Sequence, residues 1–279
     1  MTASYEAELR GRFDDDLGLG ADLPEIPWLR QVLARRTHRR YADRPVSEDL
    51  LRLLLAAAFS ASSKSDFQQV AAIRVADRAR RDRLAELVPA MPWIGTAPAF
   101  LVICGDARRL ERIGELRGHP QGNGRLEGFF NAAVDAALVL QTLILGAETA
   151  GLGCCPISVL RNHAAAVAEI LDLPDKVFPV AGLCLGWPAA PGFVSLRLPP
   201  SVTLHTDRYD DTGLPAALAD YDRRRGARYT PPREQQRQPE RFGYAEFYGW
   251  SEDKARQQAG EPEGLGFPGW LHTRGFTLD

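Results

Sequence analysis

Apolar residues recur at helical spacing in two segments of the chain. One segment follows Ser47, a residue type that favours the N-cap of a helix, and the leucines and alanines of residues 50–58 define its buried face. The other covers residues 129–150, is apolar almost all round and stops at Gly151. We expect this second helix to lie in a core or in a large subunit interface.

Shorter apolar runs predict β-strands at residues 71–76, 99–104, 153–159 and 178–186. Helical patterns lie between these strands and also cover residues 27–37 and 162–171. Residues 105–126 are mostly polar and loop-like, which is typical of a lid or a pocket loop. This order predicts an α+β sandwich in which helices cover a small, mainly antiparallel sheet.

Both ends of the chain differ from this body. Residues 1–27 are polar and irregular, and we expect them to form an arm. Beyond residue 190, Pro, Gly, Arg and Tyr dominate and long regular periodicity disappears. A C-terminal stretch of about 80 residues with so few aliphatic side chains should wrap the main body or a partner subunit. The predicted division is an arm (1–27), a main domain (28–210) and a C-terminal extension (211–279).

The composition is that of an ordinary globular enzyme. Of 279 residues, 45% are hydrophobic and 25% are charged, and the formal net charge is −2. This near-neutral balance gives no electrostatic reason to expect nucleic acid or an anionic membrane as a partner. No stretch reaches about 18 uninterrupted apolar residues, which argues against a membrane span.

The cysteines indicate a reducing compartment. Four of them lie in strand-like apolar runs without the paired spacing of a zinc site: Cys104, Cys154, Cys155 and Cys184. The N-terminal stretch also lacks the apolar segment of a signal peptide. We therefore expect reduced, buried thiols, no metal site and a cytoplasmic protein.

The usual catalytic constellations are missing from the sequence. It has no GxSxG elbow, no HExxH and no Walker loop, and its five histidines are scattered. Gly151-Leu152-Gly153 resembles the start of a dinucleotide fingerprint, but it follows a helix and lacks the third glycine. We interpret it as a helix C-cap, so a Rossmann domain is not supported.

Segments suited to anions and hydrogen bonds remain. Arg35, Arg36 and Arg39 lie where a helix is predicted to end, and converging guanidinium groups bind a phosphate monoester well, although arginine clusters are most often solvated surface. The serine-rich residues 62–65 and the amide of Gln68 offer groups that match the donor and acceptor edge of a flavin ring. Further along, a single cation in an apolar setting favours a specific partner: Arg197.

Taken in this order, these segments resemble the nitroreductase superfamily, and within it the NADPH-dependent branch of the oxygen-insensitive nitroreductases and NADPH–flavin oxidoreductases. The resemblance runs from about residue 33 to residue 209. Its most specific piece is similar to the family's R-S-x-R-x-F: Arg36-Thr37-His38-Arg39-Arg40-Tyr41. The other matching pieces are residues 61–68, 151–153 with 160–162, 182–188 and 197–199.

The resemblance implies an α+β homodimer, wrapped by its terminal segments, with FMN at the subunit interface. It places a first group around the FMN phosphate and ribityl chain: Arg35, Arg36, Thr37, Arg39 and Arg197. A second group comes from the other subunit, with its glutamine towards the ring: Ser62, Ser63, Ser65 and Gln68. A third group passes the isoalloxazine and gives backbone N–H groups near N5, which stabilise the reduced flavin: Ile157, Ser158 and Val159.

Two departures from the family pattern affect this site. The family's Lys-Pro-Arg-Leu-Pro has Ser195 at the lysine position, so one cation is lost and the flavin is expected to bind more loosely. The branch often has two glycines after the ring-contacting isoleucine, where this chain has Ser158-Val159. Their side chains should narrow or repolarise the space beside the flavin and so affect the range of substrates.

The implied mechanism is ping-pong hydride transfer carried by FMN, without a catalytic protein side chain. NADPH or NADH is the donor, and a nitroaromatic, a quinone or free flavin is the acceptor. A cation for the 2′-phosphate of NADPH is expected from the tail: Arg223–Arg225, Arg228 or Arg233. One alternative is a flavoenzyme of the same fold that dehydrogenates a small ring, removes halogen or breaks down flavin. Another is a non-enzymatic flavin-binding or partner-binding protein.

Overall fold

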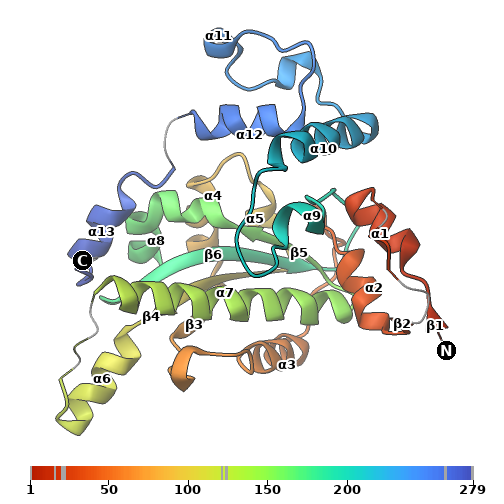
Figure 1. Ribbon diagram of the computed structural model, residues 1–279. Coiled ribbons are helices and arrows are strands. Elements are labelled where there is room, and N and C mark those ends of the chain that lie inside the picture. Colours follow the sequence, from red (N-terminus) through yellow and green to blue (C-terminus); the bar gives the residue numbers. More distant parts are fainter. Residues whose placement is uncertain are drawn as a thin grey trace. The chain divides into compact units, whose positions relative to one another are not determined.

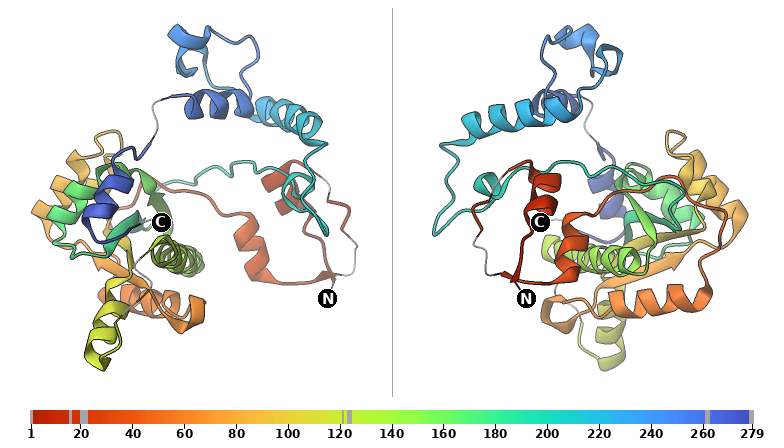
Figure 2. Two further views of the ribbon diagram at one scale, coloured as in Figure 1. Left: turned by 60° about the vertical axis from the view of Figure 1, so that its left-hand side comes forward. Right: turned by 90° about the vertical axis from the view of Figure 1, so that its right-hand side faces the viewer.

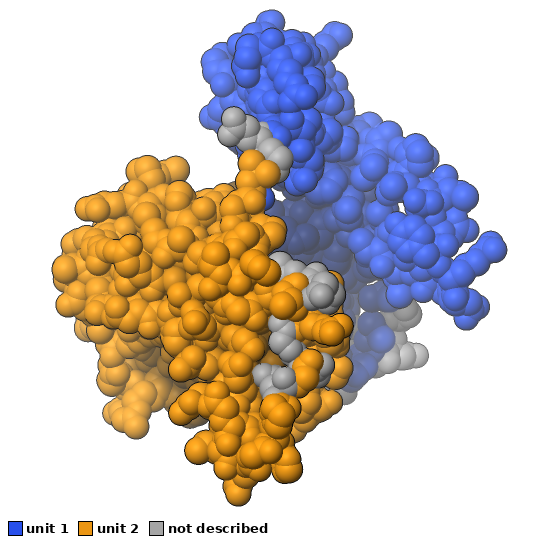
Figure 3. Space-filling model, turned by 90° about the vertical axis from the view of Figure 1, so that its left-hand side faces the viewer, with its two compact units in different colours: residues 1–35, 194–263 blue, residues 36–193, 264–279 orange. Residues whose placement is uncertain are grey.

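The computed structural model describes residues 2–15, 17–19, 23–120, 122, 125–260 and 263–277. The chain forms two compact units, coloured separately in Figure 3. Residues 1–35 and 194–263 make up the first, here called the terminal unit. Residues 36–193 and 264–279 make up the second, here called the sheet unit.

The sheet unit is built on four strands in the order β3-β4-β6-β5, and every neighbouring pair is antiparallel. The strands are β3 (Val70–Arg74), β4 (Ala99–Asp106), β5 (Gly153–Ile157) and β6 (Val177–Gly186). The four apolar runs therefore predicted strands correctly, within a few residues at each end. The expected antiparallel sheet of an α+β fold is confirmed.

Helices cover both faces of this sheet (Figures 1 and 2). One face packs on α3 (Glu48–Ala58) and α7 (Leu126–Thr149). The other packs on α4 (Arg78–Glu86), α5 (Trp93–Thr96), the 3-10 turn η2 (Ser158–His163) and α8 (Ala164–Ile170). Strand β4 is buried throughout, and its successive residues point to alternate faces, with Leu101 and Ile103 toward α7 and Val102 toward α4.

The predicted ends of the two main helices are confirmed. At the start of α3, the Ser47 hydroxyl accepts a hydrogen bond from the backbone N–H of Leu50 at 3.3 Å. After α7, Gly151 has a φ of 82°, and its N–H donates to the carbonyl of Glu148 at 3.1 Å. This left-handed glycine directly follows the cap residue Ala150 and ends the helix, as expected.

Among the described residues, α7 is the one helix long and apolar enough to cross a membrane. Its Val139 and Leu143 pack on the sheet, and the polar Asn131 and Asp135 are buried on it. These contacts are those of a core helix.

The loop-like interpretation of residues 105–126 was wrong for its first half. Residues Arg108–Arg117 form helix α6. Its first turn is capped when Asp106 Oδ1 accepts the N–H of Arg109 at 3.0 Å, and it ends at Gly118 with a φ of 70°. No residue of α6 is buried, so the sequence carries no buried stripe that would reveal it. The predicted loop also includes residues 121, 123 and 124, which lie outside the described residues.

The terminal unit contains more helix than the sequence pattern indicated. Its N-terminal part holds β1 (Thr2–Ala3), α1 (Glu6–Phe13), β2 (Leu23–Pro24) and α2 (Pro27–Leu33), so residues 1–27 are not irregular throughout. Its C-terminal part holds α9 (Pro200–Thr203), α10 (Leu214–Arg228), the 3-10 turn η3 (Arg233–Gln235), α11 (Pro239–Phe242) and α12 (Trp250–Gln258).

Hydrogen-bonded aromatic side chains replace aliphatic ones in this C-terminal part. Tyr221 of α10 is 1% exposed, packs edge-on against Trp250 at a centroid distance of 5.4 Å and donates to the carbonyl of Leu196 at 3.1 Å. Helices therefore form beyond residue 190 although the apolar periodicity is lost there, because such contacts need no 3.6-residue apolar repeat.

The last helix, α13 (Phe267–Thr273), belongs to the sheet unit. Its Leu271 and the following Phe276 are buried with Phe178 of β6 and Ala132 of α7. The Phe178 and Phe276 rings meet edge to face at 5.5 Å. This part of the C-terminal extension therefore packs on the main body of its own chain.

Candidate functional site

The arginine segment, residues 36–41, lies beside strand β5. Helix α2 ends at Leu33, and the chain continues in extended form, as predicted. Thr37 pairs with Cys154 in a parallel bridge, and the N–H of His38 donates to the Cys154 carbonyl at 2.9 Å. The approach requires a glycine at position 153, because an added Cβ would lie 2.7 Å from the His38 Cβ.

The side chains of this segment are partly held by the sheet unit. Arg36 Nη1 donates to the carbonyl of Gly192 at 3.3 Å. The Arg39 guanidinium is exposed and lies over the Trp93 ring, 5.4 Å from its centroid. It also approaches the thiol of Cys155, whose pKa burial raises and Arg39 partly lowers again. Both guanidinium groups belong to one short extended segment.

The other two predicted cations, Arg35 and Arg197, lie in the terminal unit. A buried arginine of α1, Arg12, connects their two stretches of chain. Its Nη1 donates to the carbonyl of Ser195 at 2.8 Å, its Nη2 to the carbonyl of Arg35, and its own carbonyl accepts the N–H of Arg197 at 2.8 Å. Sequence reasoning missed Arg12, because nothing in the pattern distinguishes it from the exposed Arg10 beside it.

Ser195, which occupies the position of the family's lysine, contacts the neighbouring cation. Its hydroxyl accepts a hydrogen bond from Arg197 Nη1 at 2.7 Å. Ser195, which takes the place of one expected cation, therefore orients the guanidinium of Arg197.

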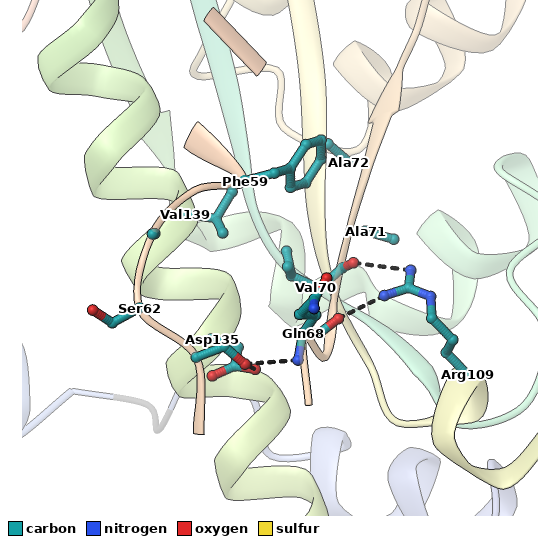
Figure 4. A pocket seen from close by; sticks show the side chains of 11 residues that line it. Phe59, Ser62, Gln68, Val70, Ala71, Ala72, Arg109, Asp135 and Val139 are labelled. Carbon is teal, nitrogen blue, oxygen red and sulfur yellow. Dashed lines mark hydrogen bonds between the residues drawn. The ribbon is translucent and has the colours of Figure 1, made fainter. Parts of the chain in front are cut away.

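The serine segment, residues 62–68, joins α3 to β3 and borders a cavity of ≈ 370 Å³ (Figure 4). The volume falls in the range of small-molecule pockets. Three residues of this segment have left-handed backbone angles although none is glycine: Ser65 (φ 51°), Asp66 (φ 59°) and Gln68 (φ 53°). The cavity is lined by Phe59, Ala61, Ser62, Ser63, Gln68, Val70, Ala71, Ala72, Arg109, Asp135 and Val139.

Asp135 of α7 is the buried charge beside this cavity, with 1% exposure. Its Oδ2 accepts the Ser63 hydroxyl at 2.7 Å and the N–H of Gln69 at 2.9 Å, and its Oδ1 accepts the N–H of Lys64 at 3.1 Å. The Ser63 oxygen in turn accepts the N–H of Gln68 at 2.6 Å. Sequence reasoning gave Asp135 no role in the site; its only signal was an acidic residue within the long apolar stretch of the helix.

The third predicted group follows β5. Ile157 is its last residue and is 1% exposed in the core, whereas Ser158 is exposed and Val159 half-buried. The strand predicted for 153–159 is therefore two residues too long, because the chain turns into η2 at Ser158. This turn lies at the end of the strand against which the arginine segment packs.

The serine and arginine segments lie at diagonally opposite corners of the sheet. The serine segment leads into β3 and the arginine segment flanks β5, which are the two edge strands. Three strand spacings separate these edges, about 14 Å. Gly105 of β4 pairs with Val70 of β3, next to the serine segment. At the other end of β4, Ala99 lies level with Cys154 of β5, because both pair with Leu185 of β6. The six residues from Ala99 to Gly105 add about 20 Å along the strand direction. The serine and arginine segments of one chain are therefore far apart.

The remaining chemistry of the described residues is limited. They contain no group of three or more His, Cys, Asp or Glu that could hold a metal ion. The four cysteines are buried and not joined in disulfides, and burial raises the pKa of Cys104 to about 12 and also that of Cys184. The raised pKa values keep the thiols of Cys104 and Cys184 protonated at neutral pH, and the candidate site offers mainly anion and hydrogen-bond contacts.

The regions that match known proteins include the arginine and serine segments. Residues 32–187 match the model of the nitroreductase family, and residues 195–279 match the model of its C-terminal domain. The chain is 36% identical over 185 residues to the FMN reductase (NAD(P)H) of Bacillus subtilis, covering 65% of this chain and 74% of that one. It is 30% identical over 251 residues to the NADPH-flavin oxidoreductase of Vibrio harveyi, covering 88% and 96%. The structure of nitroreductase A from Vibrio parahaemolyticus superposes with a TM-score of 0.79 at 29% identity, covering 92% and 100%.

Proposed function

Because this chain belongs to the nitroreductase family, we propose that it binds FMN and passes hydride from NAD(P)H to a nitroaromatic, quinone or flavin acceptor. It is an NAD(P)H-dependent flavin oxidoreductase, like the relatives named FMN reductase and NADPH-flavin oxidoreductase. The observation that carries the proposal is the family match over residues 32–187, which contains every proposed FMN ligand except Arg197. Arg197 lies in the second matching region.

The residues present fit FMN in charge and in hydrogen bonding. Arg36 and the exposed Arg39 suit a phosphate, and Arg12 keeps the chain around Arg35 and Arg197 together as a second source of cations. The hydroxyls and amide groups of residues 62–68 border a cavity and suit the polar edge of a flavin ring. We assign the turn at residues 157–159 to the ring, with its backbone N–H groups toward N5.

The diagonal placement of the segments supports a site shared between two copies of the chain. The serine segment of one protomer would meet the arginine segment of its partner, so that the dimer contains two equal sites. Helix α7 offers an apolar surface for such contact, with Leu126, Phe130, Val134 and Leu138 exposed at a spacing of four residues. We propose that residues 1–27 and 211–279 extend this contact by wrapping the body or the partner.

When bound, FMN would supply the hydride chemistry that connects NAD(P)H with the acceptor in a ping-pong reaction. The chain's own residues bind and orient. The arginines fix the phosphate end, the serine segment fixes the ring edge, and the side chains of Ser158 and Val159 limit the space beside the ring. The acceptor is a small molecule that enters after the oxidised nicotinamide leaves. We propose that the enzyme is cytoplasmic.

The 2′-phosphate of NADPH needs a cation from the tail, and the terminal unit narrows the choice. Arg224 donates to the carbonyl of Phe13 at 2.8 Å, and Arg228 to the carbonyl of Gly11 at 3.1 Å, so both are occupied with helix α1. Arg233 instead lies over the Tyr244 ring, 4.4 Å from its centroid. Arg223 pairs with Asp220, and Arg225 donates to the Tyr221 hydroxyl at 3.3 Å. We propose Arg233 as the residue that binds the 2′-phosphate.

An anaerobic titration tests the proposed activity. The protein is loaded with FMN, NADPH and NADH are added separately, and the loss of flavin absorbance is followed. We expect bleaching by at least one donor and recovery on addition of a quinone or a nitroaromatic compound. A flavin that neither nucleotide bleaches at millimolar concentration would contradict the proposal.

Mixed dimers test the shared site. Arg39→Ala and the double variant Ser62→Ala/Ser65→Ala are co-expressed with different tags, and the mixed dimer is isolated. In a shared arrangement one of its two sites receives only wild-type residues, so we expect about half the wild-type FMN content, above that of either parent dimer. If both segments served the same site within one chain, the mixed dimer would bind no more FMN than its parents.

A further inference from the structure

We propose that Asp135 is a positioning residue that holds the serine segment in its cofactor-binding shape, with Arg109 holding the same segment from the other side. The proposal rests on the proposed function, because it assumes that residues 62–68 contact FMN. It assigns to a buried acid of α7 a specific effect on flavin affinity.

The contacts of Asp135 all go to one short stretch of chain. The carboxylate accepts one hydroxyl and two backbone N–H groups, from Ser63, Lys64 and Gln69. These donors lie at the two ends of the stretch that carries the left-handed residues. Both ends of the segment are therefore held by a single buried side chain.

Arg109 of α6 acts on the carbonyls of the same stretch. Its Nη1 donates to the carbonyl of Gln68 at 2.6 Å and its Nη2 to that of Val70 at 3.1 Å, as Figure 4 shows. Asp106 holds the guanidinium in turn, at 2.8 Å. The carboxylate thus accepts from N–H groups of this stretch and the guanidinium donates to its carbonyls, so these backbone groups have partners within the chain.

The conformation of the segment explains why such support is needed. Ser65, Asp66 and Gln68 occupy a region of backbone space that non-glycine residues adopt only when their surroundings enforce it. Strained residues of this kind gather at binding sites, where the fixed shape presents side chains to a ligand. Here the strained residues carry two of the proposed ligands, Ser65 and Gln68, on the segment that borders the cavity.

The position of Asp135 in the helix also argues for a specific role. Its neighbours on the same face include the buried apolar residues Ala132 and Val139, together with the buried Asn131. A buried carboxylate among them is costly unless its hydrogen bonds are made. An apolar residue would serve packing alone, so the charge is explained by the backbone that it holds.

Asp135→Asn tests the proposal directly. The amide keeps the size of the side chain but places an NH₂ group where one of the N–H or O–H donors now points. We expect the apoprotein to bind FMN about 10- to 100-fold more weakly, measured by quenching of flavin fluorescence, because charge-assisted bonds at the site are lost. Amide hydrogen exchange over residues 63–69 should become faster, while the amides of α7 stay protected.

A matched control comes from Asp222 in the terminal unit. It is also buried, and it accepts the N–H of Ser251 at 2.9 Å together with the Ser251 hydroxyl. Asp222→Asn removes a similar set of bonds outside the serine segment, so we expect some loss of thermal stability and little change in FMN affinity. Equal weakening of FMN binding by both variants would reduce the role of Asp135 to general stability and overturn the proposal.

A second variant covers the case in which Asp135→Asn does not fold. Arg109 is 46% exposed, so Arg109→Lys should fold, and it loses the two-pronged contact with the carbonyls of Gln68 and Val70. We expect several-fold weaker FMN binding and faster exchange at residues 63–69. FMN affinity within a factor of two of wild type in every folded variant overturns the proposal. If the wild-type protein binds no FMN, the proposed function fails instead, and unchanged exchange at residues 63–69 would separately refute the hold on the segment.

Discussion

Arg12→Met should destabilise the terminal unit strongly, because the residue is 5% exposed and its guanidinium connects helix α1 to two other stretches of chain. It donates to the carbonyls of Leu33 at 2.9 Å, Ser195 at 2.8 Å and Arg35. A hydrogen bond to a charged group contributes about 1.5–3 kcal/mol, so three give at most about 5–9 kcal/mol. Burying the charge offsets part of this sum, and methionine refills some of the volume. We therefore expect a loss of about 3 kcal/mol in the free energy of unfolding.

Urea unfolding followed by circular dichroism measures this loss, with Arg10→Met as the control. Arg10 lies on the same helix, is exposed and pairs with Glu6 one turn away, so its replacement should change the free energy of unfolding by less than about 0.5 kcal/mol. The Arg12 variant should also bind FMN more weakly, since Arg35 and Arg197 lose their common support. Equal stability of the two variants would refute the reasoning.

Two further substitutions test the arginine side of the site. Ser195→Lys restores the cation of the family pattern and should tighten FMN binding about 2- to 5-fold at low salt, because an exposed charge contributes at most about 1 kcal/mol. High salt screens the charge and should remove this gain in affinity. Unchanged or weaker FMN binding in a fluorescence titration would contradict this prediction. Gly153→Ala places a Cβ 2.7 Å from the His38 Cβ and should cost about 1–3 kcal/mol in thermal unfolding. Gly213→Ala is its control, because an added Cβ there meets no atom within 4 Å, and equal losses in the two variants would show that the contact with the arginine segment is unimportant.

The sequence predicted those elements that bury a regular apolar face. Helix α3 and the four strands of the sheet have such faces, and the structure has them within a few residues of the expected bounds. Helices α6 and α10 were missed for a physical reason. The first buries no residue, and the second buries only Tyr221 and Asp222, so neither leaves a periodic apolar stripe.

The candidate site was also predicted only in part. The ligand segments could be proposed from residue types and order, because arginines, serines and amides have recognisable chemistry. The residues that hold these segments could not, because their partners are distant in the sequence. Arg12 contacts a carbonyl 183 residues away, and Asp135 contacts a hydroxyl 72 residues away. Only the folded chain makes such pairs visible.

Arg12 and Asp135 solve the same problem with opposite charge. Irregular segments beside a binding site leave backbone groups without the partners that a helix or sheet would provide. Arg12 supplies donors to three carbonyls, and Asp135 supplies acceptors to two N–H groups and a hydroxyl. Because these contacts are made by the chain's own residues, we expect them to reduce the binding energy that is used to order the two segments. The two residues should nevertheless differ in measurement. Arg12 connects distant parts of the terminal unit, so its loss should lower stability and affinity together, whereas Asp135 holds one local segment, so its loss should lower affinity more than stability.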